Sequence, residues 1–325
     1  MEDLRCYNMH MLLLSFASSL AADTQVGGAA DFIAGIAVGE GGGALTLGLR
    51  QAEGDIKVGS DDFAFEAQVD VAATFSGDGI LLYSIAPERL LIEGGGRGWK
   101  AWGGVFPGFF RLESVDPWRN QMVTGSLASA LVPGAILGGG AEFGGPSAWV
   151  NVMVGALPAT VDVFRLDDTS MGPMPFIAGA RARFDVQSVH FGGGAWFGGD
   201  IAALGFGGLE LGGAIDLGVV SPYGELVTDL RDEHAGQLGA DLFPDGAVSP
   251  GARVELDSHR GFGVAVGVAS TLFEILRIKG EASYQAGNPG VYLEVAVFSK
   301  WPADDDRYGR PTATTRTANR KRPPG

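Results

Sequence analysis

Charged side chains recur at every second position in several segments of this chain, with apolar side chains between them. The clearest run is Arg181, Arg183 and Asp185. Because alternate side chains of a strand point to opposite faces, this spacing places charge on one face only. Such a face supports either salt bridges that brace a wall or rings of charge that select ions in a water-filled lumen. The candidates for such a lumen are Arg50, Glu66, Asp70, Arg181, Arg183, Asp185, Glu210, Asp216, Arg253, Glu255, Arg277, Lys279 and Glu281.

Other residues with catalytic or ligand-binding chemistry form no recognised set in the sequence. His190, His234 and His259 lack the spacing of zinc-binding motifs, and no G-x-S-x-G motif occurs. The glycine clusters at 138–140 and 192–194 are followed by neither a lysine nor a helical pattern, so they predict turns or bulges rather than a phosphate-binding loop. We therefore expect no enzymatic activity, no metal and no cofactor.

The elements that must position the charges are two-sided strands. The segment Phe63 to Phe75 reads FAFEAQVDVAATF, with an apolar residue at every odd position and Glu66, Gln68 and Asp70 between them. Similar segments follow one another, separated by turn signals such as 287–290, Gly-Asn-Pro-Gly. Hairpins of this kind give antiparallel pairing. We predict an all-β fold, an antiparallel transmembrane β-barrel of about 14–16 strands over residues 22–301.

Composition restricts where such a barrel could lie but leaves three functions open. The chain is 46% hydrophobic and carries a net charge of −15, which disfavours binding to nucleic acid. No apolar run after the N-terminal region is long enough for a helical span, so only a closed barrel could cross a bilayer. The functions are an outer-membrane diffusion channel, a barrel that serves as a structural anchor or adhesin, and a secreted soluble β-sandwich that binds a ligand.

The N-terminal residues predict export. Met11 to Ser18 reads MLLLSFAS, and the following Ser19-Leu20-Ala21 has the small-x-small pattern of a cleavage site. We predict a signal peptide over 1–21, with translation starting at Met1 or Met9. The single cysteine, Cys6, lies before the apolar run.

Two longer segments, Pro107 to Pro133 and Asp229 to Pro250, mix charge with proline or glycine and predict loops. Such loops lie either outside the barrel on the extracellular side or folded into the lumen. For the first we favour the inward position, which would narrow the lumen, over an exposed one. The segment 302–325 is polar with a basic end and predicts a disordered tail. The candidate constriction residues in the first loop are Arg111, Glu113, Asp116, Arg119 and Asn120.

Aromatic residues gather near the ends of the predicted strands. Trp and Tyr rings are enriched where a membrane protein meets the headgroup region, so the pattern predicts an interfacial girdle. The residues concerned are Trp99, Trp102, Phe106, Phe109, Phe110, Trp149, Trp196, Phe197 and Trp301.

The segment from Gly98 to Gly144 resembles the early part of bacterial outer-membrane porins of the phosphate-selective porin O/P and related β-barrel porin families. The nearest equivalents of a family motif are Gly104, Phe106, Pro107 and Glu113. The final strand, GVYLEVAVFSKW, is similar to the aromatic-ending last strand of that group.

The resemblance implies a passive diffusion channel for small hydrophilic solutes or ions in the outer membrane of a Gram-negative bacterium. It also implies contact with outer-membrane lipid and with the barrel-assembly machinery. A homotrimer and a monomer both stay open, and the sequence names no solute.

Overall fold

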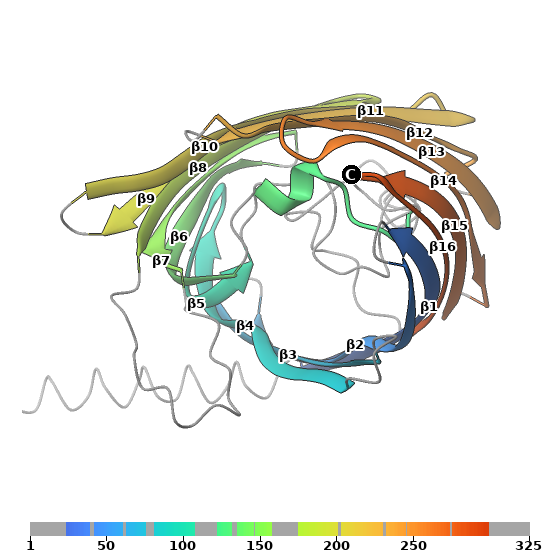
Figure 1. Cartoon of the computed structure of the whole chain (residues 1–325). Coiled ribbons are helices and arrows are strands. Elements are labelled where there is room, and N and C mark those ends of the chain that lie inside the picture. The colour runs from blue at the N-terminus through green and yellow to red at the C-terminus, as the bar shows by residue number, and fades with distance from the viewer. Residues whose placement is uncertain are drawn as a thin grey trace, which may run out of the picture.

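The protein is a closed β-barrel in a computed structural model that describes residues 24–39, 42–60, 63–75, 81–107, 122–131, 135–145, 147–157, 175–200, 203–229, 232–244, 246–273 and 275–298. The described residues form sixteen strands and a short 3-10 helix. Each strand pairs antiparallel with its neighbours in sequence, and β1 pairs with β16 to close the ring (Figure 1). This confirms the predicted all-β antiparallel barrel. Among these residues, no helix is long and apolar enough to cross a membrane.

The bounds of the elements follow from the two-sided segments of the sequence. They are β1 (Thr24–Gly39), β2 (Gly42–Ser60), β3 (Phe63–Phe75), β4 (Leu81–Gly96), β5 (Trp99–Pro107), η2 (Ala128–Leu131), β6 (Ala135–Gly145), β7 (Ala148–Ala156), β8 (Phe176–Val186), β9 (Val189–Asp200), β10 (Ala203–Ile215), β11 (Val220–Asp229), β12 (His234–Leu242), β13 (Val248–Asp257), β14 (Gly261–Leu272), β15 (Leu276–Gln285) and β16 (Asn288–Phe298).

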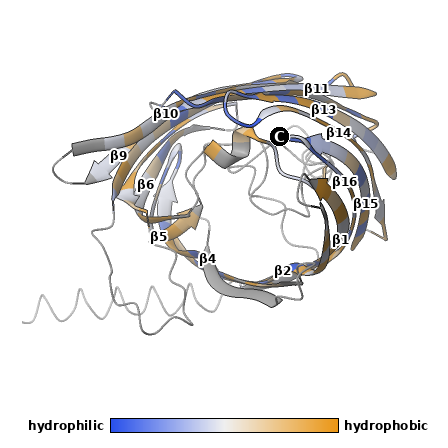
Figure 2. Ribbon diagram, in the orientation of Figure 1, coloured by the Kyte–Doolittle hydropathy of each residue, from blue (hydrophilic) through white to orange (hydrophobic). Residues whose placement is uncertain are grey.

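The two faces of the strands differ in polarity. In β7, Val150, Val152 and Val154 are exposed, whereas Asn151 and Met153 between them are buried. Figure 2 shows hydrophobic and hydrophilic residues alternating around the barrel. Because alternate residues of a closed barrel face outward and inward, the exposed apolar residues form the outer face and the buried polar residues the inner face.

A bulge in β2 changes which residues of that strand point inward. Asp31 of β1 pairs with Gln51, and Phe32 pairs with Leu49, so Arg50 has no partner in the register. The extra residue of such a bulge reverses which residues of the strand point inward from there on. Before it the even-numbered residues of β2 face inward, and after it Gln51 and Glu53 do so.

Inward-facing aromatic rings lie over glycines of the adjacent strand. At each of these glycines, an added Cβ would collide with the ring of its cross-strand partner. Glycine therefore leaves room for a large ring on a crowded concave wall, as in the pairing of strand glycines with aromatic residues in other sheets. The pairs are Trp102 over Gly140, Trp196 over Gly208, Tyr223 over Gly239 and Tyr292 over Gly35.

Two predictions of irregular structure are wrong. The segment Asp229 to Pro250 contains β12 and the start of β13, and the glycine clusters at 138–140 and 192–194 lie inside β6 and β9. In both cases the strands form because each of them pairs with a neighbouring strand on both sides, which offsets the poor strand propensity of glycine.

The predicted aromatic girdle is also largely wrong. Trp102, Phe106, Trp149 and Trp196 lie on the inner face and are no more than 8% exposed. In each strand they alternate with the exposed apolar residues. Because successive side chains point to opposite faces of a strand, these rings point inward. Trp99 and Phe197 are exposed on the outer face. Phe109, Phe110 and Trp301 lie outside the described residues.

The connections differ in length between the two ends of the barrel. The two longest, 108–134 and 157–175, lie at the same end, because β5 and β7 run in the same direction. At the opposite end, where β1 begins and β16 finishes, the strands are joined by turns of two to five residues.

The face assignment predicts how the barrel responds to charge on its outer wall. Leu293 lies at the centre of β16 and is exposed. Leu293→Arg should lower the free energy of unfolding by about 2–4 kcal/mol in a bilayer, because the charge would enter the apolar band. Urea unfolding of vesicle-embedded protein, followed by heat-dependent gel migration, measures this change.

Thr46→Arg is the matched control, because Thr46 alternates with exposed Leu45 and Leu47 and so faces inward. Its unfolding free energy should change by less than about 1 kcal/mol. Equal losses in the two variants would contradict the assignment of faces.

Candidate functional site

The inner face of the barrel carries many charged residues that are buried and paired with one another. Burying a charge is costly unless an opposite charge or hydrogen bonds compensate it. The paired side chains come from one strand, from adjacent strands or from strands two apart. The described inner wall includes four groups of such residues, two of which also bind a segment that leaves the sheet.

The first group lies at the seam where the barrel closes. Arg50 Nη1 of β2 donates to Glu294 Oε2 of β16 at 2.9 Å, and its Nε lies 3.9 Å from Asp31 Oδ2 of β1. Lys279 Nζ of β15 forms an ion pair with Glu294 Oε1. Four strands on both sides of the seam are thereby linked by charge.

A second group joins β2, β3 and β4. Arg89 Nη1 donates to Glu66 Oε1 at 3.1 Å, and Lys57 Nζ donates to Glu93 Oε1 at 3.1 Å. The amide of Gln68 donates to Glu53 Oε2 at 3.2 Å. Acidic and basic groups here partly neutralise one another.

A third group spans β8 to β10. Arg181 Nη2 reaches Glu210 Oε1 at 3.2 Å across Gly194 of β9, which pairs with both residues and has no side chain to separate them. Toward the end of β8, Asp185 Oδ1 accepts a hydrogen bond from Arg183 Nε at 3.1 Å and lies 2.6 Å from His190 Nδ1.

The fourth group binds the backbone of a segment inside the barrel. Glu281 of β15 accepts hydrogen bonds from the N–H groups of Val123 at 2.5 Å and Thr124 at 3.0 Å, and from the Thr124 hydroxyl at 2.5 Å. Arg253 of β13 donates to the carbonyls of Thr124 at 3.1 Å and Gly125 at 3.2 Å. The wall thus supplies partners for backbone groups that no strand satisfies.

Two further side chains complete this arrangement. Arg50 Nη1 donates to the Val123 carbonyl at 2.7 Å, and Gln285 Nε2 donates to the Gly125 carbonyl at 3.1 Å. Arg50 therefore joins the seam group to the inner segment. We call Arg50, Arg253, Glu281 and Gln285 the wall clamp.

Apolar contacts fix the same segment on either side of the clamp. Met122 is buried against Gly251 of β13 and Gly267 of β14, where an added Cβ would come within 3.1 Å of its Cε and Sδ, respectively. Farther along, Ala128 of η2 joins a buried cluster with Val227 of β11 and Ala235 of β12. Figure 1 shows η2 inside the ring of strands, so residues 122–131 follow the inner wall from β15 to β11.

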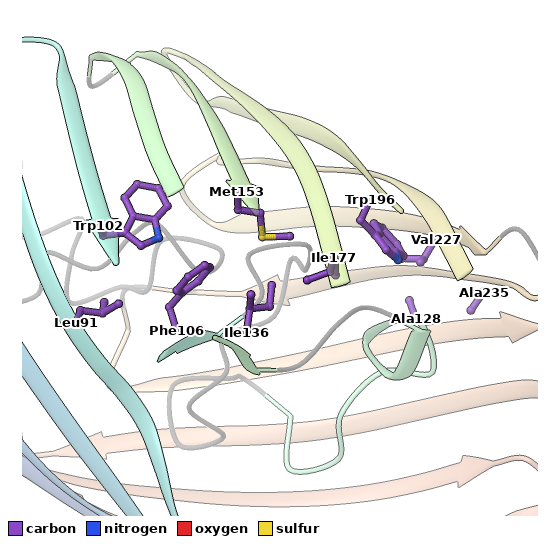
Figure 3. Packing of buried hydrophobic residues seen from close by; sticks show 10 residues of the cluster. All are labelled: Leu91, Trp102, Phe106, Ala128, Ile136, Met153, Ile177, Trp196, Val227 and Ala235. Carbon is purple, nitrogen blue, oxygen red and sulfur yellow. The ribbon is translucent and has the colours of Figure 1, made fainter. Parts of the chain in front are cut away.

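The buried cluster extends well beyond η2. Figure 3 shows its side chains in a band across successive strands, from Leu91 and Trp102 to Val227 and Ala235. An apolar band on the inner face is a feature that strict alternation of polar and apolar residues does not predict. Its members are Leu91, Trp102, Phe106, Ala128, Ile136, Met153, Ile177, Trp196, Val227 and Ala235.

Most of the sequence-predicted lumen residues share the inner face. Asp216 directly follows β10 and Asp70 lies in β3, but the structure does not describe the side chain of Asp70. The structure brings Arg181 to Glu210, Arg183 to Asp185 and Lys279 to Glu294 as described above. The inner-face residues are Arg50, Glu66, Arg181, Arg183, Asp185, Glu210, Arg253, Glu255, Arg277, Lys279 and Glu281.

The candidate constriction residues Arg111, Glu113, Asp116, Arg119 and Asn120 lie outside the described residues. The same connection between β5 and β6 does place residues 122–131 inside the barrel.

Several inner-face residues were not among the predicted set. Glu53 and Lys57 follow the bulge at Arg50, which reverses the inward parity of β2, so counting from Leu45 places them on the wrong face. Continued alternation with exposed Phe32, Leu90 and Tyr284 would have found the others. The residues missed are Asp31, Glu53, Lys57, Arg89, Glu93 and Gln285.

No protein-family model matches this chain, and no curated protein is similar to it in sequence. Solved structures of bacterial porins do have a similar fold. The anion-selective porin from Comamonas acidovorans matches with a TM-score of 0.59 and 12% identity, over 85% of this chain and 99% of that one. A mutant of Rh. blastica porin matches with a TM-score of 0.57 and 12% identity, over 85% and 100% of the two chains.

OmpT of Vibrio cholerae, in a form lacking loop L8, matches with a TM-score of 0.56 and 14% identity, over 85% of this chain and 99% of that one. At these identities the likeness concerns the fold, and the chain has the β-barrel fold of bacterial porins. The resemblance is confirmed at this level, whereas its narrower part, the phosphate-selective porin O/P group, stays a prediction.

The clamp makes a prediction about the inner segment. Glu281→Gln replaces a carboxylate that accepts three hydrogen bonds, each worth about 1.5–3 kcal/mol when an ionised group takes part. Chymotrypsin should then cleave after Leu127, which is buried, at least about tenfold faster than in the wild type. Mass spectrometry of the fragments locates the cleavage.

Ser283→Ala changes the next inward residue of β15 and should leave the cleavage rate unchanged. If Glu281→Gln were as resistant as the control while keeping a folded barrel, the clamp would not hold the segment.

Proposed function

We propose that this protein is an outer-membrane channel for passive diffusion of small hydrophilic solutes or ions. The observation that carries the proposal is a closed barrel of sixteen strands with an apolar outer face and a charged inner face. An exposed apolar wall on a closed barrel suits lipid, and a charged interior suits water. The porin fold supports the same function.

Residues 122–131 narrow the lumen in this proposal. The wall clamp and the buried Met122 hold them against the inner face between β11 and β15. Arg111, Glu113, Asp116, Arg119 and Asn120 precede this segment in the same connection and are proposed to contribute to the constriction.

The charges of the inner wall favour weak preference for cations. Carboxylates outnumber cationic groups among the buried residues that the structure describes, but many are paired within the wall. Paired charges contribute little net field, so the selectivity is modest. The buried acidic residues are Asp31, Glu53, Glu66, Glu93, Glu210, Glu225, Asp241, Glu255, Asp257, Glu281 and Glu294, against Arg89, Arg181, Arg253 and Lys279.

Export and assembly complete the proposal. The segment 1–21 acts as a signal peptide, the barrel-assembly machinery inserts the chain, and outer-membrane lipid surrounds it in a Gram-negative cell. The barrel end with short turns faces the periplasm, because outer-membrane barrels have short periplasmic turns and longer extracellular loops. A homotrimer is an assembly consistent with the fold.

A second candidate function is a structural barrel whose lumen is closed. The inner apolar cluster favours it, because Phe106, Ile136 and Ile177 are fully covered although they lie on the inner face. Apolar residues covered in this way form a core that occupies part of the interior. Electrical conductance distinguishes this candidate from the channel.

The channel proposal predicts stepwise currents when purified protein is added to a planar lipid bilayer. In Glu281→Gln the released segment should interrupt the current with frequent partial closures, whereas Ser283→Ala should behave as the wild type. Folded, membrane-inserted protein that passed no current would favour the closed structural barrel and reject the channel.

The charge distribution predicts the reversal potential in a gradient of KCl. Potassium should permeate more readily than chloride at about 0.01 M salt, where the Debye length is about 30 Å. It should lose this advantage near 1 M, where the Debye length is only about 3 Å and the wall charges are screened. Lys57→Gln should strengthen the preference, because the Lys57 side chain is 30% exposed on the inner face. A strong preference for chloride would contradict the charge argument.

A further inference from the structure

Three neighbouring turns at the end of the barrel with short connections carry large apolar side chains. They join β10 to β11, β12 to β13 and β14 to β15. The side chains are between 46% and 86% exposed. We call them the apolar rim, which consists of Leu217, Val219, Phe243, Phe273 and Ile275.

Backbone hydrogen bonds make the rim one continuous surface. Phe243 N–H donates to the Val219 carbonyl at 2.7 Å, which joins the first turn to the second. Thr271 N–H, at the end of β14, donates to the Ala247 carbonyl at 3.2 Å, which joins the second turn to the third. The exposed residues therefore gather on one side of the mouth.

Backbone conformation does not explain why these turns hold phenylalanine. Phe243 and Phe273 have positive φ values of 49° and 55°, a region that bulky residues rarely adopt. Gln187 and Ala286 take nearly the same φ, 53° and 51°, in other turns. Glycine or asparagine would suit such positions better. The choice of an exposed aromatic side chain therefore points to an apolar medium outside the protein.

The other turns at this end of the barrel have polar sequences. They read Asp61-Asp62, Arg97-Gly98, Pro146-Ser147 and Gln187-Ser188. Large apolar side chains within the turns are thus confined to the side formed by β10 to β15, although exposed Val186 and Val189 flank the Gln187-Ser188 turn.

Strand length places the rim near the edge of the membrane. Strands β10 to β15 have 9 to 13 residues, and a strand that crosses a bilayer needs about 9–11. Leu242, Val248 and Leu272, which adjoin the turns, are exposed and apolar as well. The rim is therefore continuous with the outer wall.

We propose that the apolar rim inserts into the phospholipid leaflet on the periplasmic side and anchors the β10–β15 side of the barrel. Apolar and aromatic side chains gain free energy where acyl chains meet headgroups. The inference rests on the proposed membrane location. It adds a specific lipid-binding surface that the polar turns on the opposite side lack.

The test uses spin labels on single cysteines in full-length barrels that carry Cys6→Ser. Phe273→Cys and Val219→Cys place the label on the rim, and Gln187→Cys places it in a polar turn at the same end. Val268→Cys, on the exposed outer face of β14, is the reference for lipid. Proteins reconstituted in phosphatidylcholine and phosphatidylglycerol vesicles are compared for label accessibility to oxygen and to a water-soluble nickel chelate.

Labels at 273 and 219 should favour oxygen over the nickel chelate several-fold, as at 268, whereas the label at 187 should favour the chelate. Rim labels that behave as the one at 187, with lipid contact at 268, would overturn the proposal and leave the membrane barrel intact. If the label at 268 also favoured the chelate, the membrane location itself would fail.

A second measurement removes any influence of the label. Phe273→Asp should lower the urea midpoint of unfolding in these vesicles, whereas Phe273→Leu, which keeps an apolar side chain, and Gln187→Asp should leave it nearly unchanged. A loss in Phe273→Leu as large as that in Phe273→Asp would show that the ring packs specifically within the protein and would overturn the lipid anchor.

Discussion

The rest of the structure depends on the pairing of every strand with two neighbours. A closed ring leaves no sheet edge, so the backbone hydrogen bonds are satisfied within the wall whatever surrounds it. The alternating position of a side chain along its strand then determines whether it faces the interior of the barrel or its surroundings. This allows glycine-rich strands such as β6 and β9 to form although their intrinsic strand propensity is low.

Closure also determines the chemistry of the interior. Charges brought to a concave wall approach one another closely, and the inner face compensates them by pairing within and between strands. In one such pair, Arg181 reaches Glu210 over Gly194 of the strand between them. The wall clamp uses the same charges in another way, because Glu281 and Arg253 bind backbone groups of a segment that no strand pairs with. Charge on the inner wall therefore has a structural role as well as any role in ion selection.

The two apolar surfaces beyond the outer wall show where simple alternation is insufficient. Inside, Phe106 and Ile177 belong to a covered cluster, which makes part of the interior a packed core. At one mouth, Phe243 and Phe273 are exposed in turns where polar residues would suit the backbone. Apolar side chains are thus distributed unevenly around the circumference of the barrel. The inner cluster occupies part of the lumen, and the exposed turn residues extend the surface that contacts lipid in our proposal.

The sequence by itself determined the strand character and the inward direction of residues such as Arg183, Glu255 and Glu281, because a period of two is a local property of extended backbone. It did not determine the inward position of Glu53, since one extra residue at Arg50 reverses the parity. Nor did it distinguish Trp102 and Trp196 from an interfacial girdle, because their rings find space only over glycines of adjacent strands. The strand β12 and the clamp around Val123 likewise depend on partners distant in sequence, and only the closed barrel brings those partners together.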